Sequence, residues 1–160
     1  MKILLLGKNG QVGWELQRSL APLGELIALD RHSQELCGKR ADWQGLATTV
    51  QTGRPDLIVK AAAYTAGDKG ESEPELARTI NALAPGVLAQ EASKLGAWLL
   101  HYSTDYVFDG SGARPWLETD TPAPLSVYGQ TKLEGEQRIQ VACVKHLIFR
   151  TSWVYAARGG

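Results

Sequence analysis

The chain has 160 residues, of which 44% are hydrophobic and 21% are charged, a balance typical of one globular domain with a sizeable core. Seventeen basic residues balance seventeen acidic ones, so no net charge favours a nucleic acid or a membrane surface as a partner. The two cysteines, Cys37 and Cys143, lack the spacing of a metal site, and buried or free thiols are expected there.

Short apolar runs alternate with longer amphipathic stretches, which is typical of a parallel sheet with helices on both faces. The first run is too short for a signal peptide or a membrane span and leads into a glycine-rich turn, so a cytoplasmic enzyme is expected. Six strands would fill the order of a doubly wound α/β sheet of the Rossmann type. The expected strands are Lys2–Leu6, Glu25–Leu29, Gln34–Cys37 (the weakest), Leu57–Ala61, Ala97–Tyr102 and His146–Arg150.

Helix signals fall between these runs. Ser72 and Glu75 have the spacing of a capping box, and Gly96 follows the helix that they would open. Pro85 lies inside that helix and is expected to kink it, because proline removes one backbone donor. The expected helices are Val12–Leu20, Asp42–Thr52, Ser72–Leu95 and Val127–Gln140.

The later part of the chain suggests how the domain is organised. Asp109–Pro124 is rich in Gly, Pro, Thr and Asp and predicts a long loop of the kind that often has a function. The sequence stops soon after the last expected strand. We therefore expect residues 1–160 to form one domain that carries all of the candidate site residues described below, without a C-terminal substrate domain.

A glycine-rich loop joins the first strand to the first helix. Such glycines permit a tight turn and let the backbone approach a pyrophosphate, while the helix N-terminus offers free N–H groups and a positive dipole. The spacing differs from the Gly-x-Gly-x-x-Gly fingerprint, but the same role is expected. The expected cofactor-binding residues of this loop are Gly7, Gly10, Gln11, Val12 and Gly13.

An acidic residue follows the second expected strand. Asp30 lies about twenty residues after the glycine loop, where a carboxylate accepts hydrogen bonds from the adenosine ribose. Arg31 beside it offers a partner for a 2′-phosphate. NADH and NADPH therefore both stay open as the cofactor.

Tyr128 and Lys132 are four residues apart and share one face if their segment is helical. A free tyrosine has a pKa of about 10, and a neighbouring ammonium is expected to lower it, so that the phenol can protonate a carbonyl oxygen while hydride arrives from the nicotinamide. The lysine is also placed to hold the nicotinamide ribose. Thr104 and Asp105 follow a strand at the sheet edge where ligands bind, and they are expected to bond the reacting carbonyl and a sugar hydroxyl.

These residues together resemble the extended short-chain dehydrogenase/reductase superfamily, and within it the dTDP-4-dehydrorhamnose reductase family. The resemblance runs over almost the whole chain. It is carried by Lys2-Ile3-Leu4-Leu5-Leu6-Gly7, Gly10-Gln11-Val12-Gly13, Ala61-Ala62-Ala63-Tyr64-Thr65, Glu71-Ser72-Glu73-Pro74, Ser103-Thr104-Asp105-Tyr106-Val107-Phe108-Asp109-Gly110, Tyr128-Gly129-Gln130-Thr131-Lys132-Leu133-Glu134-Gly135-Glu136 and Arg150-Thr151-Ser152-Trp153-Val154-Tyr155.

The resemblance implies a function and a set of roles. The implied reaction is the NAD(P)H-dependent reduction of the C4 carbonyl of dTDP-4-dehydro-L-rhamnose to dTDP-L-rhamnose, a precursor of cell-surface polysaccharide. Thr104, Tyr128 and Lys132 would be catalytic, and Asp105 and Trp153 would contact the sugar. From the residues alone, Trp153 would be placed in the core. The implied cofactor-binding residues are Gly10, Gln11, Val12, Asp30, Ala63, Tyr64, Thr65, Tyr128 and Lys132.

One further position bears on metals and partners. Glu15 matches a position linked, in some members of the family, to a magnesium-bridged dimer. From the residues alone it is a solvated helix glutamate. A homodimer with Mg²⁺ at its interface therefore stays open, with no other metal site expected.

Several residues depart from the family pattern. Lys39 and Arg40 stand where the family has an acidic segment that recognises the adenine, which puts a positive charge near the cofactor. Lys60 occupies a strand end where the family tends to have Asn, and a buried lysine there needs a phosphate or carboxylate partner. Gly67 and Gly70 replace larger residues and are expected to loosen their loop.

Length is the largest departure, because the chain matches about the N-terminal half of the family pattern. The groups that position the substrate are then incomplete, so the isolated chain is expected to bind NAD(P)H weakly and to reduce substrate poorly. Two alternatives remain. One is an epimerase or dehydratase of another nucleotide-sugar, although Thr104 is followed by Asp105 and Tyr106 and not by the Asp-Glu pair of a dehydratase. The other is a non-catalytic NAD(P)-binding regulatory subunit.

Overall fold

Five parallel strands form one sheet, in the order β2-β1-β3-β4-β5, in the computed structural model, which describes residues 1–30, 43–65 and 67–158. Each matches an expected strand, with shifts of up to two residues at the ends, and the Rossmann-type sheet is confirmed. The expected strand at Gln34–Cys37 lies outside the described residues. The strands are β1 (Lys2–Leu6), β2 (Glu25–Leu29), β3 (Leu57–Lys60), β4 (Trp98–Thr104) and β5 (His146–Thr151).

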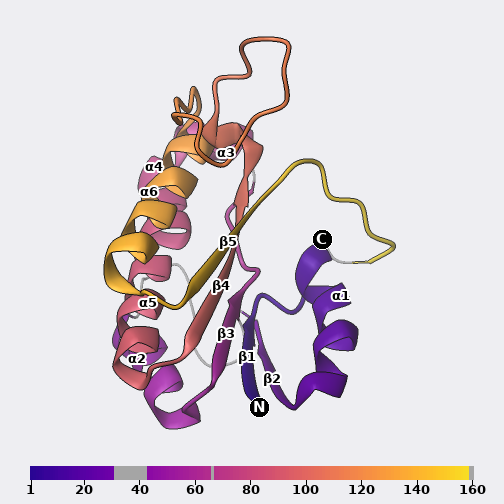
Figure 1. Cartoon of the computed structure of the whole chain (residues 1–160), viewed down its shortest axis with the longest axis vertical. Coiled ribbons are helices and arrows are strands. Elements are labelled where there is room, and N and C mark those ends of the chain that lie inside the picture. Colours follow the sequence, from indigo (N-terminus) through magenta and orange to yellow (C-terminus); the bar gives the residue numbers. More distant parts are fainter. Residues whose placement is uncertain (31–42, 66, 159–160) are drawn as a thin grey trace.

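Helices lie on both faces of the sheet: α1 on one, and α2, α5 and α6 on the other (Figure 1). The expected loop at 109–124 is confirmed and holds no helix or strand. No helix in the described ranges is long and apolar enough to cross a membrane. The helical elements are α1 (Gln11–Leu20), η1 (Ala21–Leu23), α2 (Trp43–Gly53), α3 (Gly67–Ser72), α4 (Pro74–Arg78), η2 (Thr79–Leu83), α5 (Ala84–Leu95), η3 (Asp105–Val107) and α6 (Val127–Ala142).

The single helix expected over Ser72–Leu95 was wrong in two respects. Ser72 ends the short helix α3 and does not cap the next one, which begins at Pro74 after Glu73, without a side-chain cap. The segment directly before Pro85 is a π-helical turn, η2. Because Pro85 has no N–H, the carbonyl four residues earlier loses its α-helical donor, and a wider turn accommodates the change.

The glycines expected to loosen a loop lie instead in helix α3, which covers Gly67–Ser72. A Cβ added at Gly70 would meet the ring of Tyr64 at 3.8 Å, an ordinary contact distance. Side-chain volume therefore does not explain why glycine is present at Gly70.

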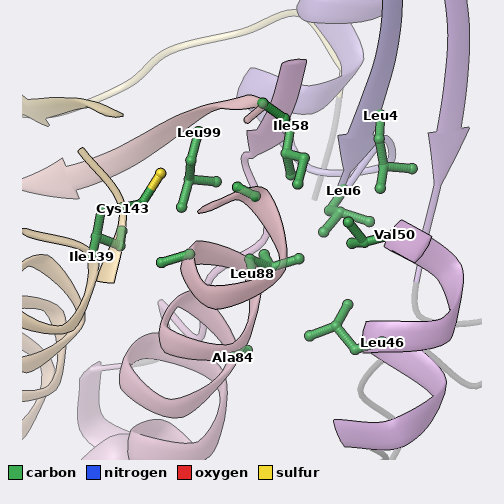
Figure 2. Close-up of a cluster of buried hydrophobic side chains, with 13 residues drawn as sticks. Leu4, Leu6, Leu46, Val50, Ile58, Ala84, Leu88, Leu99, Ile139 and Cys143 are labelled. Atoms are coloured by element: carbon green, nitrogen blue, oxygen red, sulfur yellow. The ribbon is translucent and has the colours of Figure 1, made fainter. Parts of the chain in front are cut away.

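Alternating side chains of the strands build two hydrophobic layers. On β1, Leu4 and Leu6 pack against α2, α5 and α6, whereas Ile3 and Leu5 face α1 (Figure 2 shows the first layer). Each fully buried side chain of this size contributes about 2 kcal/mol relative to exposure. The layer under α5 and α6 therefore fixes the helix that carries Tyr128.

The α1 face of the sheet is covered only in part. Helix α1 packs over β1 and β2, while large apolar side chains on β4 and β5 remain open to solvent. Trp98 is 46% exposed, Leu147 46% and Phe149 44%. Phe149 packs edge-on against Tyr102, with 5.9 Å between the ring centroids.

Candidate active site

The glycine loop after β1 makes a very close approach to the segment that follows β3, residues 61–65. Gly7 has a φ of 95°, a conformation that suits glycine, and a Cβ at this position would lie 2.5 Å from the backbone nitrogen of Ala62. A Cβ at Gly13 would lie 1.9 Å from the carbonyl oxygen of Gly7, so α1 packs directly on the loop. Both positions require glycine for steric reasons.

The N-terminus of α1 has the features of a phosphate-binding site. Gly10 is the N-cap residue and supplies no side-chain hydrogen bond to the first turn, and Gln11 and Val12 begin the helix. The backbone N–H groups of this turn are therefore available to an anion, with the positive end of the helix dipole behind them. The loop is held in place where the N–H of Gly7 donates to the carbonyl of Leu29, at 2.8 Å.

Asp30 follows β2 at the same edge of the sheet. The side-chain amide of Asn9 donates to its carboxylate, and the ammonium of Lys8 lies 4.0 Å from it. The acidic group expected to bind the ribose therefore lies beside the glycine loop. Lys39 and Arg40, expected to bind the cofactor, and the neighbouring Arg31 lie outside the described residues.

The segment after β3 is joined to the catalytic helix through Asn81. The side chain of Asn81 accepts from the N–H of Tyr64 at 2.9 Å and donates to its carbonyl at 3.0 Å, and it also donates to the hydroxyl of Thr131 on α6 at 3.2 Å. Ala63 and Thr65 flank the anchored residue. Asn81 is fully buried, so its amide orients the expected cofactor-lining segment against α6.

Asn81 was not among the site residues expected from the sequence, although Pro85 offered a signal for it. Pro85 lies four residues later, and its missing N–H leaves the carbonyl of Asn81 without the usual helical donor. That carbonyl lies against α6, where a Cβ at Gly135 would be 2.2 Å away. In this chain, Pro85 therefore marks the point at which the backbone of Asn81 closely approaches α6.

Thr104 and Tyr128 meet at the carboxyl end of β4. Thr104 is the last residue of the strand; it is buried, accepts from the N–H of Tyr106 at 3.2 Å and donates to the carboxylate of Asp105 at 3.3 Å. The ring of Tyr106 packs edge-on against Tyr128, with 6.0 Å between centroids. Burial raises the pKa of Tyr128, a hydrogen bond with Thr104 lowers it, and the charge of Asp105 raises it.

Lys132 lies one turn beyond Tyr128 and is 2% exposed. Its ammonium donates to the backbone carbonyl of Tyr102 on β4, at 2.5 Å. Burial, followed by the charge of Lys60, lowers the pKa of Lys132 to about 7, while Glu136 acts in the opposite direction.

The pKa shift of Tyr128 therefore differs in direction from the expected one. From the sequence, the ammonium of Lys132 was expected to lower the pKa of Tyr128. In the structure that ammonium is bonded to the carbonyl of Tyr102, and burial of the phenol raises the pKa of Tyr128. The phenol therefore keeps its proton at neutral pH and is a weaker acid than a free tyrosine.

A buried carboxylate on α6, that of Glu136, was also not predicted from the sequence. Glu136 is 1% exposed; it accepts from the hydroxyl of Ser103 on β4 at 2.5 Å and from the guanidinium of Arg150 on β5 at 2.7 Å. This hydrogen bond raises the pKa of Arg150. The network ties two strands to the helix that carries the Tyr and Lys pair, and its partners are too far apart in sequence to form a motif.

Lys60 is the last residue of β3 and is 3% exposed. From the sequence, the buried ammonium of Lys60 was expected to have a phosphate or carboxylate partner. One hydrogen bond of this ammonium goes to the backbone carbonyl of Ala62, in the segment that approaches the glycine loop. A carbonyl therefore supplies part of the compensation that burial demands.

Two expected residues remain, Trp153 and Glu15. Trp153 follows β5 and is 76% exposed, so its placement in the core was wrong. Glu15 lies on α1 and pairs with Arg18 at 2.8 Å. No cluster of metal-ligating side chains occurs within the part of the chain that the structure describes.

The residues present fit a bound dinucleotide. Gly7 and Gly13 form a cradle that any Cβ would fill, the first turn of α1 leaves its N–H groups available, and Asp30 lies beside the loop. Anchored contacts then lead from the loop through the segment after β3 to α6. Among the described residues, those expected to bind the nucleotide and those expected to act in catalysis thus belong to one edge of the sheet.

Comparisons with known proteins cover the whole chain. The dTDP-4-dehydrorhamnose reductase of Escherichia coli (strain K12) is 63% identical over 159 residues, which are 99% of this chain and 53% of that protein. The enzyme of the same description from Burkholderia thailandensis is 48% identical over 99% of this chain and 52% of its own length. The chain spans about half the length of the curated relatives it matches.

Solved structures agree with the fold. A dTDP-4-dehydrorhamnose reductase from Clostridium acetobutylicum superposes with a TM-score of 0.91 at 39% identity, over 98% of this chain and 55% of that one. The corresponding enzyme from Bacillus anthracis, solved in complex with NADP, gives 0.91 at 36% identity, over 100% and 57%. The family model described as the RmlD substrate binding domain matches residues 1–160, and the chain belongs to this family.

Proposed function

We propose that the chain is the nucleotide-binding and proton-donating part of an NAD(P)H-dependent reductase, which converts dTDP-4-dehydro-L-rhamnose to dTDP-L-rhamnose. The observation that carries the proposal is the joining of two features at one sheet edge. The glycine loop contacts the segment after β3, and Asn81 bonds that segment to the helix of Tyr128 and Lys132. Relatives of up to 63% identity bear the name of this activity.

The dinucleotide would lie along the glycine loop. Its pyrophosphate would take the free N–H groups at the start of α1, and Asp30 would accept hydrogen bonds from the adenosine ribose. When bound, NADH or NADPH supplies a hydride. The B. anthracis relative was solved with NADP, and both cofactors stay within the proposal.

Tyr128 would give its phenolic proton to the C4 oxygen as the carbon receives hydride, and water would later return that proton. Burial raises the pKa of Tyr128, so the phenol is protonated before the reaction but is a weaker acid than a free tyrosine. The buried Thr104 hydroxyl would hold the same carbonyl oxygen in place, and Lys132 would bond a ribose hydroxyl. Asp105 and the exposed indole of Trp153 would contact the sugar.

Glu15 gives little support to a magnesium-bridged dimer. Its carboxylate pairs with Arg18 one turn away on the same helix, which is what a solvated helix glutamate does. The proposal therefore includes a nucleotide-sugar substrate but requires neither Mg²⁺ nor a second copy of the chain.

A chimera tests the proposal while supplying the rest of the length. Residues 1–160 would replace the matching half of the E. coli relative, and NADPH oxidation would be followed with dTDP-4-dehydro-L-rhamnose. We expect turnover, and we expect Tyr128→Phe to lower kcat by about 10²- to 10⁴-fold with little change in NADPH affinity.

Two results would contradict the proposal. Equal turnover in the chimera and its Tyr128→Phe variant would remove the phenol from the chemistry. NADPH binding without any substrate-dependent oxidation would favour the non-catalytic regulatory subunit. The matched control is Tyr155→Phe, because Tyr155 is 85% exposed on the segment after β5.

A further inference from the structure

Three basic side chains share one buried layer between the sheet and α6. Lys60 and His101 are register partners on β3 and β4, so their side chains lie next to each other on one face. That face is the one under α5 and α6, because Ile58 and Leu99, two residues earlier on each strand, pack there. Lys60 is 3% exposed and His101 is fully buried.

The third basic group enters this layer from the helix. The ammonium of Lys132 donates to the carbonyl of Tyr102, the residue after His101. The imidazole therefore has one ammonium beside it on the neighbouring strand and another above it from α6. In agreement, burial, then the charge of Lys132, then that of Lys60, lowers the pKa of His101.

The charges around Lys132 include one nearby carboxylate that already has partners. Glu136, one turn further along α6, forms an ion pair with Arg150 at 2.7 Å and accepts from Ser103. Glu134 lies on the same helix and pairs with two arginines. The described titratable and charged groups on the elements around Lys132 are Lys60 of β3, His101 and Tyr102 of β4, His146 and Arg150 of β5, Asp105 and Tyr106 of η3, Glu71 of α3, Glu75 and Arg78 of α4, Glu91 and Lys94 of α5, and Tyr128, Glu134, Glu136 and Arg138 of α6.

We propose that Lys60 is a positioning residue of the candidate active site: its buried ammonium disfavours a second positive charge in the layer that it shares with Lys132. Three observations support this proposal. Lys60 and Lys132 enter the same layer between the sheet and α6, and both lysines are buried. The ammonium of Lys132 is bonded to the carbonyl of Tyr102, the residue after His101. The pKa of Lys132, about 7, agrees, with burial as the larger cause and Lys60 as the second.

The consequence for catalysis rests on the proposed function. A charged Lys132 would donate its hydrogen bond to a ribose hydroxyl of the cofactor more strongly than a neutral one. Lys60 would therefore restrict this charged form to the acid side of neutrality, and reduction would slow as the pH rises through about 7. An uncharged side chain in place of Lys60 would extend the active range toward alkaline pH.

The test follows lysine protonation directly in the 160-residue chain. The ε-methylene signals of ¹³C-labelled lysine would be titrated by NMR from about pH 5 to about pH 11, a range that covers shifted and ordinary lysines. Lys132→Met identifies the Lys132 signal. We expect its midpoint to rise by about one pH unit or more in Lys60→Met, which removes the charge but keeps a similar length. Lys94→Met, at an exposed position on α5, is the matched control and leaves the midpoint in place.

An unchanged Lys132 midpoint in Lys60→Met would overturn the proposal. If that variant does not fold, the reciprocal measurement decides, because coupling between two sites is mutual. The midpoint of Lys60 must then rise in Lys132→Met, and an unchanged Lys60 midpoint would equally overturn the proposal. Neither titration needs cofactor or substrate, so its failure is distinct from a chimera that does not reduce the sugar.

Discussion

His101 is fully buried on β4, and neither of its ring nitrogens has a hydrogen-bond partner among the described residues. Burial, with the charges of Lys132 and Lys60, places its pKa well below 6.5. The folded chain therefore holds this imidazole neutral, whereas the unfolded chain takes up a proton below pH 6.5. Because the unfolded state then binds more protons, the free energy of unfolding falls as the pH falls, by up to about 1.4 kcal/mol per pH unit from this group.

Replacement of His101 tests this pH dependence. We expect His101→Leu to lose less stability than the parent chain between about pH 6.5 and about pH 5, since the variant has no imidazole to protonate on unfolding. Urea unfolding at both pH values measures the difference, and carboxylates affect both proteins alike. A parent chain and variant with the same pH slope would contradict the assignment.

Glu136 is the residue on which the position of α6 depends most. Glu136→Gln would leave the half-buried guanidinium of Arg150 without its carboxylate and remove the bond from Ser103, so we expect a loss of about 3 kcal/mol in the free energy of unfolding. Glu134→Gln is the matched control. Glu134 lies two residues earlier on α6, at 29% exposure, and pairs with Arg78 and Arg138, so its loss should cost less than about 1 kcal/mol. Equal losses in urea unfolding would show that burial does not distinguish the two carboxylates.

At the scale of elements, the start of α6 is positioned by a glycine between Tyr128 and Lys132. A Cβ at Gly129 would lie 2.2 Å from the carbonyl oxygen of Tyr106 in η3, so the two elements touch through backbone atoms. The N-cap residue Ser126 accepts from the N–H of Gly129 at 3.1 Å and fixes the first turn. The pair of functional side chains thus depends on a contact in which it takes no part.

Two helical glycines give a matched test of this contact. We expect Gly129→Ala to push α6 away from η3 and to lower the turnover of the chimera at least about tenfold, since small displacements of a catalytic group are costly. Gly86→Ala in α5 would meet only the flexible side chain of Arg138, at 3.3 Å, and should leave turnover close to that of the parent. Similar turnover in both variants would contradict the role given to the backbone contact.

Local patterns predicted the strands and the sequence motifs well, because apolar runs and glycine spacing are properties of neighbouring residues. The helix over Ser72–Leu95 was wrong because a π-helical turn depends on how Asn81 meets α6, whereas Pro85 alone indicated only a kink. Glu136 was not predicted for the same reason, because its partners Ser103 and Arg150 lie on two strands that are distant from it in sequence. The Tyr128 pKa was expected to fall because spacing shows that Lys132 is near, but not which carbonyl its ammonium binds.

For the whole molecule, two features matter: no described helix covers part of the α1 face of the sheet, and the chain matches only part of the length of its relatives. Trp98, Leu147 and Phe149 form an exposed apolar strip on the α1 face, and the chain spans about half the length of its curated relatives. We expect the 160-residue chain alone to bind NAD(P)H weakly and to reduce the sugar nucleotide poorly, because positioning groups supply much of the rate. Fluorescence titration and an oxidation assay measure both properties, and turnover equal to that of the chimera would contradict the expectation.

One bound dinucleotide should reach from the glycine loop to Tyr128 and Lys132. An amide NMR titration of the chain with NADPH, compared with 2′,5′-ADP, tests this most directly, since weak binding suits the method. We predict that both ligands shift the amides of Gly7–Gly13, and that only NADPH, which has the nicotinamide, also shifts those of Tyr128 and Lys132. Shifts at the loop with no NADPH-specific change on α6 would contradict a single site.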